Sequence, residues 1–320
     1  MVKKILILAG GGGHTGYAQI LAEELIGKCE LCFLVPEEDA LSVSRLESYG
    51  KVWMITKPRH PTTPTRIFIF RLVRAFFQAL GRVSRDVDVV VSTGSNFCIP
   101  PALIAWMKGI PIVNLESRVR FSKPSSTASI LQYFAEVTAL QWEEQRRILK
   151  GTVFGPILPK RKMEPWKGGY ILVAGGTYGY KELFDTVSVS KFKNVVIQTG
   201  ILNGSKYKKE HLEWKVISFT DKFDELLAGA EVVVSPPGGT PIEAVVYGKP
   251  VVIVRYPEWT KAADPIDTKI FAEKLNAPFL QRLTPLALET AVEEAKMREV
   301  PALRDGTKAL VEAILSLHNT

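Results

Sequence analysis

Short apolar runs alternate with stretches of helical periodicity along the whole chain. In the first half, the runs are rich in β-branched residues and are largely apolar from end to end. They fall at 5–9, 31–35, 52–55, 87–92, 111–115, 137–140 and 153–154. Such runs, separated by helices, are typical of a parallel sheet that helices cover on both faces.

A break follows at residues 155–169, where three prolines and three glycines indicate a linker. The alternation then resumes, with predicted strands at 170–174, 194–198, 215–218, 231–235 and 250–254. Predicted helices cover 221–228, 241–247, 268–275, 285–298 and 303–317. The chain is therefore predicted to be α/β, with two doubly wound, Rossmann-like domains at 1–158 and 159–320. The pattern leaves open whether the last helix packs back on the first domain.

The expected place for a ligand follows from this architecture. Doubly wound sheets bind ligands at the carboxyl ends of their strands. With two such domains facing each other, the cleft between them is the expected active site.

The charge of the chain is uneven. The first 160 residues hold 20 basic and 13 acidic side chains, whereas the remainder holds 21 and 20. A basic half beside a neutral half favours an anionic partner, such as nucleic acid, anionic lipid or a phosphorylated substrate. Solubility alone is the simpler explanation of the same charge.

The cysteines and the longest apolar runs indicate in which cellular compartment the protein is expected. Cys29 and Cys32 form a C-x-x-C without a second pair, so we interpret them as small hydrophobic residues and expect no metal site. No apolar run reaches the roughly 18 residues that a membrane span needs. We expect a cytoplasmic protein, either free or bound peripherally to a membrane.

A glycine run and a histidine follow the first predicted strand. Residues 10–13 are all glycine, and His14 and Thr15 follow them. Glycines let the backbone turn sharply, and the N–H groups of a helix start suit a phosphate. The spacing is not a clean dinucleotide fingerprint. His14 can act as base, acid or donor near neutral pH, or it can simply cap or pack the helix.

Two more polar turns end strands of the first domain. Ser-Thr-Gly-Ser-Asn at 92–96 follows one strand and would line the same sheet edge. Glu116, Arg118 and Arg120 follow the next strand. A carboxylate there could accept a hydroxyl proton and arginines could bind phosphates, or the group could be a surface ion pair.

The second domain has two similar turns. Ala-Gly-Gly-Thr-Tyr-Gly at 174–179 is a candidate phosphate loop, and Ser-Pro-Pro-Gly-Gly-Thr-Pro-Ile-Glu at 235–243 opens a helix. Pro241 suits the first helical turn, so Thr240 is the expected cap. A nucleotide diphosphate could bind this helix start, and Glu243 could hold ribose hydroxyls.

A basic stretch without acidic residues runs from 48 to 85. At helical spacing, one predicted face carries Arg71, Arg74, Gln78, Arg82 and Arg85, and the other carries Leu72, Val73, Phe76, Phe77, Leu80 and Val83. With the preceding 67–70 segment, this pattern fits either a membrane-surface helix or a core helix with an arginine-rich solvent face. The aromatic apolar side argues against nucleic acid as the partner.

Together the motifs resemble a known enzyme family. The stretches 10–15 (GGGGHT), 114–120 (NLESRVR) and 140–144 (LQWEE) look like the membrane-recruiting subunit of the UDP-GlcNAc transferase of N-glycan assembly. The stretches 174–177 (AGGT) and 235–244 (SPPGGTPIEA) look like its catalytic subunit. The chain resembles both subunits fused and, more distantly, the peptidoglycan enzyme that adds GlcNAc to lipid I.

The resemblance implies a GT-B fold and an inverting transfer that needs no metal or other cofactor. The donor would be a UDP-sugar, bound by residues 159–320. The acceptor would be a polyprenyl-diphosphate-linked sugar, bound by residues 1–158 at an anionic membrane surface on the cytoplasmic face.

The resemblance also implies roles for single residues. For the donor these are Gly175, Gly176, Thr177, Gly238, Gly239, Thr240 and Glu243. It also places His14 at the reaction centre. From the polar turns themselves we predict acceptor-phosphate contacts at Gly12, Gly13, Thr15, Ser117, Arg118 and Arg120. From the amphipathic pattern we predict membrane contacts at Phe68, Phe70, Arg71, Arg74 and Phe77. An inverting transfer needs a base, for which His14 is the hypothesis and Glu116 its rival.

Two departures from the family pattern concern the donor. The family's Gln that grips the sugar hydroxyls is absent, and Asp267 and Thr268 stand at the corresponding positions, where we expect them to contact the donor. Pro236 and Pro237 replace the usual His-Ala. The donor could therefore be another UDP-hexose.

Alternative functions remain within the same fold. They are a UDP-sugar 2-epimerase, a synthase with a diacylglycerol acceptor, and a non-catalytic nucleotide-sugar-binding scaffold.

Overall fold

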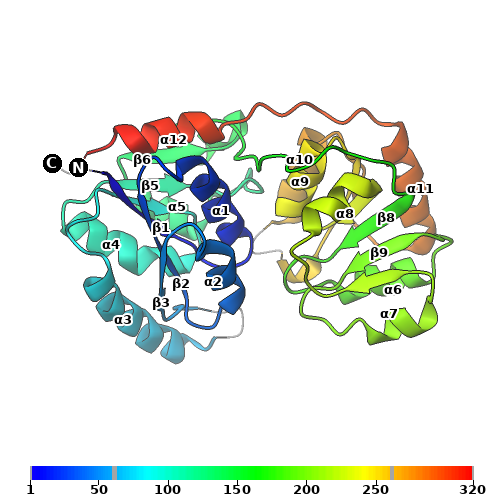
Figure 1. Cartoon of the computed structure of the whole chain (residues 1–320), viewed down its shortest axis with the longest axis horizontal. Coiled ribbons are helices and arrows are strands. Elements are labelled where there is room, and N and C mark those ends of the chain that lie inside the picture. Colours follow the sequence, from blue (N-terminus) through cyan, green and yellow to red (C-terminus); the bar gives the residue numbers. More distant parts are fainter. Residues whose placement is uncertain (1, 60–62, 260–262, 319–320) are drawn as a thin grey trace. The chain divides into compact units, whose positions relative to one another are not determined.

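The computed structural model describes residues 2–59, 63–259 and 263–318. The chain divides into two compact units (Figure 1). The first comprises Met1–Ile157 and Arg304–Thr320, and the second comprises Leu158–Leu303.

A seven-stranded sheet forms the first unit in the part of the chain that the structure describes. Its order is β3-β2-β1-β4-β5-β6-β7, and all neighbours run parallel. The strands are β1 (Lys4–Leu8), β2 (Glu30–Pro36), β3 (Lys51–Ile55), β4 (Val89–Ser92), β5 (Ile112–Leu115), β6 (Val137–Leu140) and β7 (Thr152–Val153). The α-helices are α1 (Gly13–Leu25), α2 (Ala40–Leu46), α3 (Thr65–Arg82), α4 (Ile99–Met107), α5 (Ser126–Leu131) and α12 (Thr307–Ser316).

Helices cover both faces of this sheet, which is why its strands are largely apolar. Ile5 and Ile7 of β1 lie in one core cluster with residues of α1 and α12. Leu6 and Leu8 lie in another cluster with residues of α3 and α4. All four side chains are fully buried. Figure 1 shows α12 beside α1 and α3 beside α4.

The second unit repeats the plan. Over the described residues its sheet has six parallel strands in the order β10-β9-β8-β11-β12-β13. They are β8 (Tyr170–Ala174), β9 (Val195–Gln198), β10 (Lys215–Ile217), β11 (Ala230–Ser235), β12 (Val251–Val254) and β13 (Phe279–Leu280). The helices are α6 (Lys181–Ser188), α7 (Ser205–Glu210), α8 (Phe223–Gly229), α9 (Gly239–Val246), α10 (Pro265–Lys274) and α11 (Pro285–Met297). The two-residue β13 is too short to stand out in the hydrophobic pattern.

The last helix belongs to the first unit. Leu310, Val311 and Ile314 of α12 are buried in the same core cluster as α1. Residues 304–320 therefore group with the first unit, the alternative that the sequence pattern left open. An apolar helix face does not itself specify which sheet it covers, so the sequence pattern could not decide this.

The strand order reverses beside the first strand of each sheet. β1 lies between β2 and β4, and β8 lies between β9 and β11. At such a switch point, two adjacent parallel strands are followed by helices that lie on opposite faces of the sheet. Ligands bind there, outside the carboxyl ends of the two strands. The loops after β1 and β4 meet at the first switch point, and those after β8 and β11 flank the second.

Candidate active site

The glycine run after β1 forms an open helix start. α1 begins at Gly13, and its cap residue Gly12 has a φ of 56° and no side-chain capping bond. Gly11 also has a positive φ, of 90°. A side chain would be strained at both positions, so glycine is required there. The loop thus leaves the first backbone N–H groups of α1 without a side-chain cap, as an anion site requires.

His14 is held by the loop after β4. Its Nδ1 lies 2.6 Å from the carbonyl oxygen of Thr93. A carbonyl can only accept, so Nδ1 carries the proton and Nε2 of the neutral ring carries the lone pair. Burial, aided by the charge of Lys57, lowers the pKa of His14 to about 4 despite the bond to Thr93. The ring is therefore neutral near pH 7 and can accept a proton at Nε2.

Glycine at position 94 makes room for this ring. Gly94 has a φ of 98°, and a Cβ built there would lie 2.9 Å from Cε1 of His14 and 3.0 Å from Nδ1. On the β1 side, a Cβ at Gly10 would lie 2.5 Å from Cβ of Ser95. The two loops touch, so the switch point is a closely packed site.

Glu116, the predicted rival base, is buried. It is 0% exposed, and its carboxylate accepts the backbone N–H of Ser117 (2.6 Å) and that of Ser125 (2.8 Å). Burial raises the pKa of Glu116 in spite of these two bonds. Both oxygens are engaged away from solvent, which favours a structural role for Glu116 over that of the base.

The side chains of two residues predicted to bind the acceptor phosphates, Arg118 and Thr15, also point into the protein interior. Arg118 is buried, with Nε donating to the hydroxyl of Tyr17 at 2.8 Å and Nη2 to the carbonyl of Ile157 at 3.2 Å. The Thr15 hydroxyl is buried against the Ser42 hydroxyl at 2.6 Å. These two predictions are therefore corrected, because both side chains support the fold. Ser117 and Arg120 remain partly exposed.

The glycine loop after β8 packs closely against the residues behind it. A Cβ at Gly175 would lie 2.5 Å from Cζ of Phe184, and Gly176 has a φ of 72°. Behind them, a Cβ at Gly200 would lie 2.4 Å from the carbonyl oxygens of both Gly176 and Thr177. Gly176 and Thr177 stay partly exposed, so this loop presents backbone at the carboxyl end of β8.

The helix start after β11 lies two residues earlier than predicted. α9 begins at Gly239, with Gly238 as its cap and without a side-chain capping bond. Thr240 is therefore inside the helix and is not its cap. A Cβ at Gly239 would lie 3.3 Å from Oε1 of Glu243, so this carboxylate stands beside the first turn. No atom of the described residues lies within 4 Å of a Cβ built at Gly238, which leaves that backbone open to a ligand.

The two residues that stand in place of the family's Gln are buried. Asp267 is 0% and Thr268 is 1% exposed. The Thr268 hydroxyl donates to the carbonyl of Asp264 at 2.8 Å, one turn earlier in the helix. Their burial does not favour the prediction that they contact the donor sugar, because neither side chain reaches the surface.

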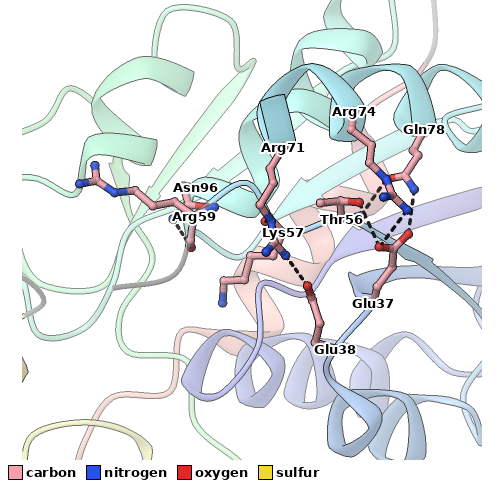
Figure 2. Close-up of polar contacts among 9 residues, drawn as sticks. All are labelled: Glu37, Glu38, Thr56, Lys57, Arg59, Arg71, Arg74, Gln78 and Asn96. Carbon is pink, nitrogen blue, oxygen red and sulfur yellow. Dashed lines mark hydrogen bonds and ion pairs between the residues drawn. The ribbon is translucent and has the colours of Figure 1, made fainter. Parts of the chain in front are cut away.

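Arg71 and Gln78 of the predicted polar side of α3 turn toward the protein, while much of the apolar side faces solvent. Gln78 accepts the Thr56 N–H at 2.8 Å and donates to Glu37 at 2.7 Å, and Arg71 pairs with Glu38 (Figure 2). Arg74 lies 3.7 Å from the Glu37 carboxylate. The predicted assignment of the arginine-rich face to solvent or lipid is thus wrong for Arg71.

The exposed residues of α3 include aromatic and aliphatic side chains beside Arg66, Arg74 and Arg82. Phe70 is 68% and Phe77 is 67% exposed, and Ile69 and Val73 accompany them. Phe68 is half-buried, with the Arg59 guanidinium 5.7 Å from its ring centroid. Residues 67–70 lie within α3 instead of preceding it.

One residue near the site escaped the sequence interpretation. Lys57 appeared only as a member of the basic stretch, yet its Nζ donates to the carbonyl of Gly10 at 2.9 Å. Its position, two residues beyond the end of β3, is a signal that could have indicated it, because the carboxyl ends of parallel strands meet at one edge.

Comparisons with known proteins divide the chain at the same place. Residues 5–157 match the family described as Oligosaccharide biosynthesis protein Alg14 like, and residues 170–299 match the glycosyltransferase family 28 C-terminal domain. A relative from Flavobacterium psychrophilum is 26% identical over 362 residues, with 97% of each chain covered. It is named UDP-N-acetylglucosamine--N-acetylmuramyl-(pentapeptide) pyrophosphoryl-undecaprenol N-acetylglucosamine transferase.

Solved structures share the fold. Acinetobacter baumannii MurG has a TM-score of 0.69 at 19% identity, covering 99% of this chain and 100% of its own. The UDP-GlcNAc 2-epimerase of Neisseria meningitidis has a TM-score of 0.65 at 14% identity, covering 98% and 99%. At these identities, the likeness shows the fold alone.

The two parallel-sheet units and the family 28 domain define the chain as a glycosyltransferase of the GT-B fold. Its first unit matches the Alg14-like family model, and its second matches the glycosyltransferase family 28 C-terminal domain. The resemblance read from the sequence motifs is thereby confirmed. Among the described residues, no helix is both long and apolar enough to span a bilayer.

Proposed function

We propose that this chain transfers GlcNAc from UDP-GlcNAc to a polyprenyl-diphosphate-linked sugar at the cytoplasmic face of a membrane, with inversion at the sugar's anomeric carbon. The observation that carries the proposal is the fixed tautomer of His14 at the switch point of the first sheet. The named activity of the Flavobacterium psychrophilum relative supports the donor and the class of acceptor.

His14 is the general base in this proposal. Nε2 takes the proton of the acceptor hydroxyl as the hydroxyl oxygen attacks the anomeric carbon of the donor sugar. The bond between that carbon and the UDP oxygen breaks on the opposite face, and UDP leaves with the bonding electrons. Proton acceptance of this kind accelerates a reaction by about a hundredfold to ten-thousandfold.

The second unit binds the donor in this proposal. The diphosphate contacts the backbone N–H groups at the start of α9, where Gly238 and Gly239 leave the backbone accessible. Partial positive charge at a helix start stabilises the departing diphosphate, so the transfer needs no metal ion or other cofactor. Glu243, beside that turn, holds the ribose hydroxyls.

The exposed apolar side of α3 supports the membrane part of the proposal. Phe70 and Phe77 would enter the acyl boundary of the bilayer, and basic residues of the first unit would meet anionic headgroups. A lipid-linked acceptor is presented at that surface, so docking brings the protein to its substrate.

Purified enzyme with radiolabelled UDP-GlcNAc, UDP-Glc or UDP-GlcA and polyprenyl-diphosphate-linked sugars tests the proposal. We expect label in the lipid fraction, greatest with UDP-GlcNAc, unchanged by EDTA, and a product of inverted anomeric configuration by NMR. The Glu243→Ala variant should lose UDP affinity in calorimetry, with Glu213→Ala in the same unit as the control.

Other outcomes favour the alternatives. Conversion of UDP-GlcNAc without a lipid acceptor would favour the 2-epimerase. Binding of UDP without turnover on any acceptor, including diacylglycerol, would favour a non-catalytic binding protein.

A further inference from the structure

The segment 56–59, which follows β3, is held in place from two sides. Arg71 of α3 donates from Nε to the carbonyl of Lys57 at 2.9 Å. Asn96, after β4, accepts the Arg59 N–H at 3.2 Å and donates to the Arg59 carbonyl at 3.3 Å. Figure 2 shows these contacts on either side of Lys57. The backbone that carries Lys57 is therefore fixed relative to β4 and α3.

From this backbone, the Lys57 side chain reaches the glycine loop. Its ammonium donates to the Gly10 carbonyl at 2.9 Å, and a Cβ built at Gly11 would lie 3.5 Å from Nζ. The same ammonium contributes to the lowered pKa of His14. Burial lowers the pKa of Lys57 itself. A cation is thus held, partly withdrawn from water, beside the glycine loop that leads into α1, and its charge acts on the candidate base.

The acidic residues whose charges act on Lys57, Asp39 and Glu38, make their hydrogen bonds and ion pairs with other residues. Asp39 caps α2, accepting the N–H of Ser42 at 3.0 Å and its hydroxyl at 2.6 Å. Glu38 pairs with Arg71. Within the described residues, Lys57 has one hydrogen bond and no ion pair. An ammonium has three N–H donors, and a charge in this setting is stabilised when an anion binds it.

We propose that Lys57 binds the diphosphate of the lipid-linked acceptor and positions the acceptor sugar against Nε2 of His14. This inference rests on the proposed function and adds a residue to its acceptor site. The leaving diphosphate of UDP offers the same chemistry, so the experiment separates the two sources.

Steady-state kinetics of Lys57→Met provide the first arm. A hydrogen bond to a charged group contributes about 1.5–3 kcal/mol, which corresponds to roughly a 10- to 150-fold effect. We expect the KM for the lipid acceptor to rise by about that factor, with the KM for UDP-GlcNAc and the inhibition constant of UDP changed less than about threefold. Lys51→Met, at the opposite end of β3, removes the same charge and should leave all three constants unchanged.

Direct binding provides the second arm, which does not depend on turnover. Geranyl diphosphate and geraniol share a tail and differ in the diphosphate. Wild type should bind the diphosphate more tightly by calorimetry, and Lys57→Met should lose most of that preference. If Lys57→Met does not fold, Lys57→Gln takes its place, with the thermal midpoint as the check of folding.

The outcomes are distinguishable. An active wild type whose acceptor KM is unchanged in Lys57→Met overturns the role of Lys57. A rise in the UDP inhibition constant instead assigns the lysine to the leaving group and overturns the acceptor role. A wild type that is inactive on every lipid acceptor contradicts the proposed function, while the geranyl diphosphate comparison still tests Lys57 as a diphosphate ligand.

Discussion

Nδ1 of His14 donates a hydrogen bond to the carbonyl oxygen of Thr93, and this 2.6 Å contact joins the loops after β1 and β4. Thr93 is itself anchored, because its hydroxyl donates to the Leu8 carbonyl at 2.8 Å, at the end of β1. The Thr93 carbonyl, which fixes the tautomer of the His14 ring, is therefore part of the sheet edge. A base whose lone pair is directed by the backbone stays oriented before substrate binds.

The pH dependence of kcat/KM should reflect the lowered pKa of His14. Because the neutral ring is the base and its pKa is about 4, activity should be nearly constant from pH about 6 to about 8 and fall only towards pH about 4. An ordinary histidine would lose activity near pH 6.5. Initial rates across this range test the prediction. A loss of kcat/KM in wild type as the pH falls through about 6.5, absent from the residual activity of His14→Gln, would contradict a desolvated base.

The same shift affects folding. Between pH about 6.5 and about 4, the unfolded chain binds a proton at His14 more readily than the folded chain does. The free energy of unfolding should therefore decrease as the pH falls through this window. Urea denaturation at several pH values should show a shallower decrease in His14→Gln than in wild type.

Gly94→Ala should impair catalysis by displacing the base. Its Cβ would lie 2.9 Å from the His14 ring, and its φ of 98° costs an L-residue about 1–2 kcal/mol. Gly109→Ala is the matched control, because its φ is 73° but its Cβ would have no described atom within 4 Å. Both variants should lose similar stability in thermal denaturation. We expect Gly94→Ala alone to lower kcat at least about tenfold, and equal kcat values in the two variants would argue against it.

Glu116→Gln should lose stability more than chemistry. The carboxylate accepts two backbone N–H groups, whereas an amide offers one acceptor oxygen and an NH₂ group. One buried N–H then loses its partner, at a cost of about 1–3 kcal/mol. The urea midpoint should fall while kcat of the folded fraction stays within about threefold of wild type. A well-folded variant without turnover would restore Glu116 as the base.

Phe70→Ser with Phe77→Ser should weaken membrane binding without unfolding the protein. Each ring is about two-thirds exposed, and burying a Phe side chain contributes about 1.5–3 kcal/mol. Sedimentation with vesicles of anionic lipid should show at least a tenfold weaker partition for the double variant. Leu212→Ser, at an 89% exposed residue of the second unit, is the control. Equal partition of both variants would exclude α3 as the docking surface.

The hydrophobic pattern alone was sufficient to predict two parallel α/β sheets. Its signal is local, because a strand covered by helices on both faces must be apolar at every position, as 5–8 and 232–234 are. The glycine loops at 10–13 and 238–239 were also predictable. Only glycine readily takes the left-handed conformation that Gly11 and Gly12 adopt.

What the sequence could not decide is the direction of individual polar side chains. Thr15, Glu116 and Arg118 are polar like His14, but each forms hydrogen bonds with neighbouring residues in the protein interior. For α3, the predicted separation into two faces holds only in part, because Phe76 and Val83 pack on the core while Arg74 and Arg82 stay exposed. The acids after β2 hold two polar side chains against the protein, since Glu38 pairs with Arg71 and Glu37 accepts from Gln78.

The sequence by itself therefore determined the fold class and the loops at the strand ends, since both follow from burial and backbone conformation over a few neighbouring residues. The tertiary structure alone decided which of the candidates faces a ligand. The tautomer of His14 depends on a carbonyl 79 residues away, and the charge beside it depends on Lys57, 43 residues away. Contacts at that separation arise only when parallel strands bring their carboxyl ends to one edge.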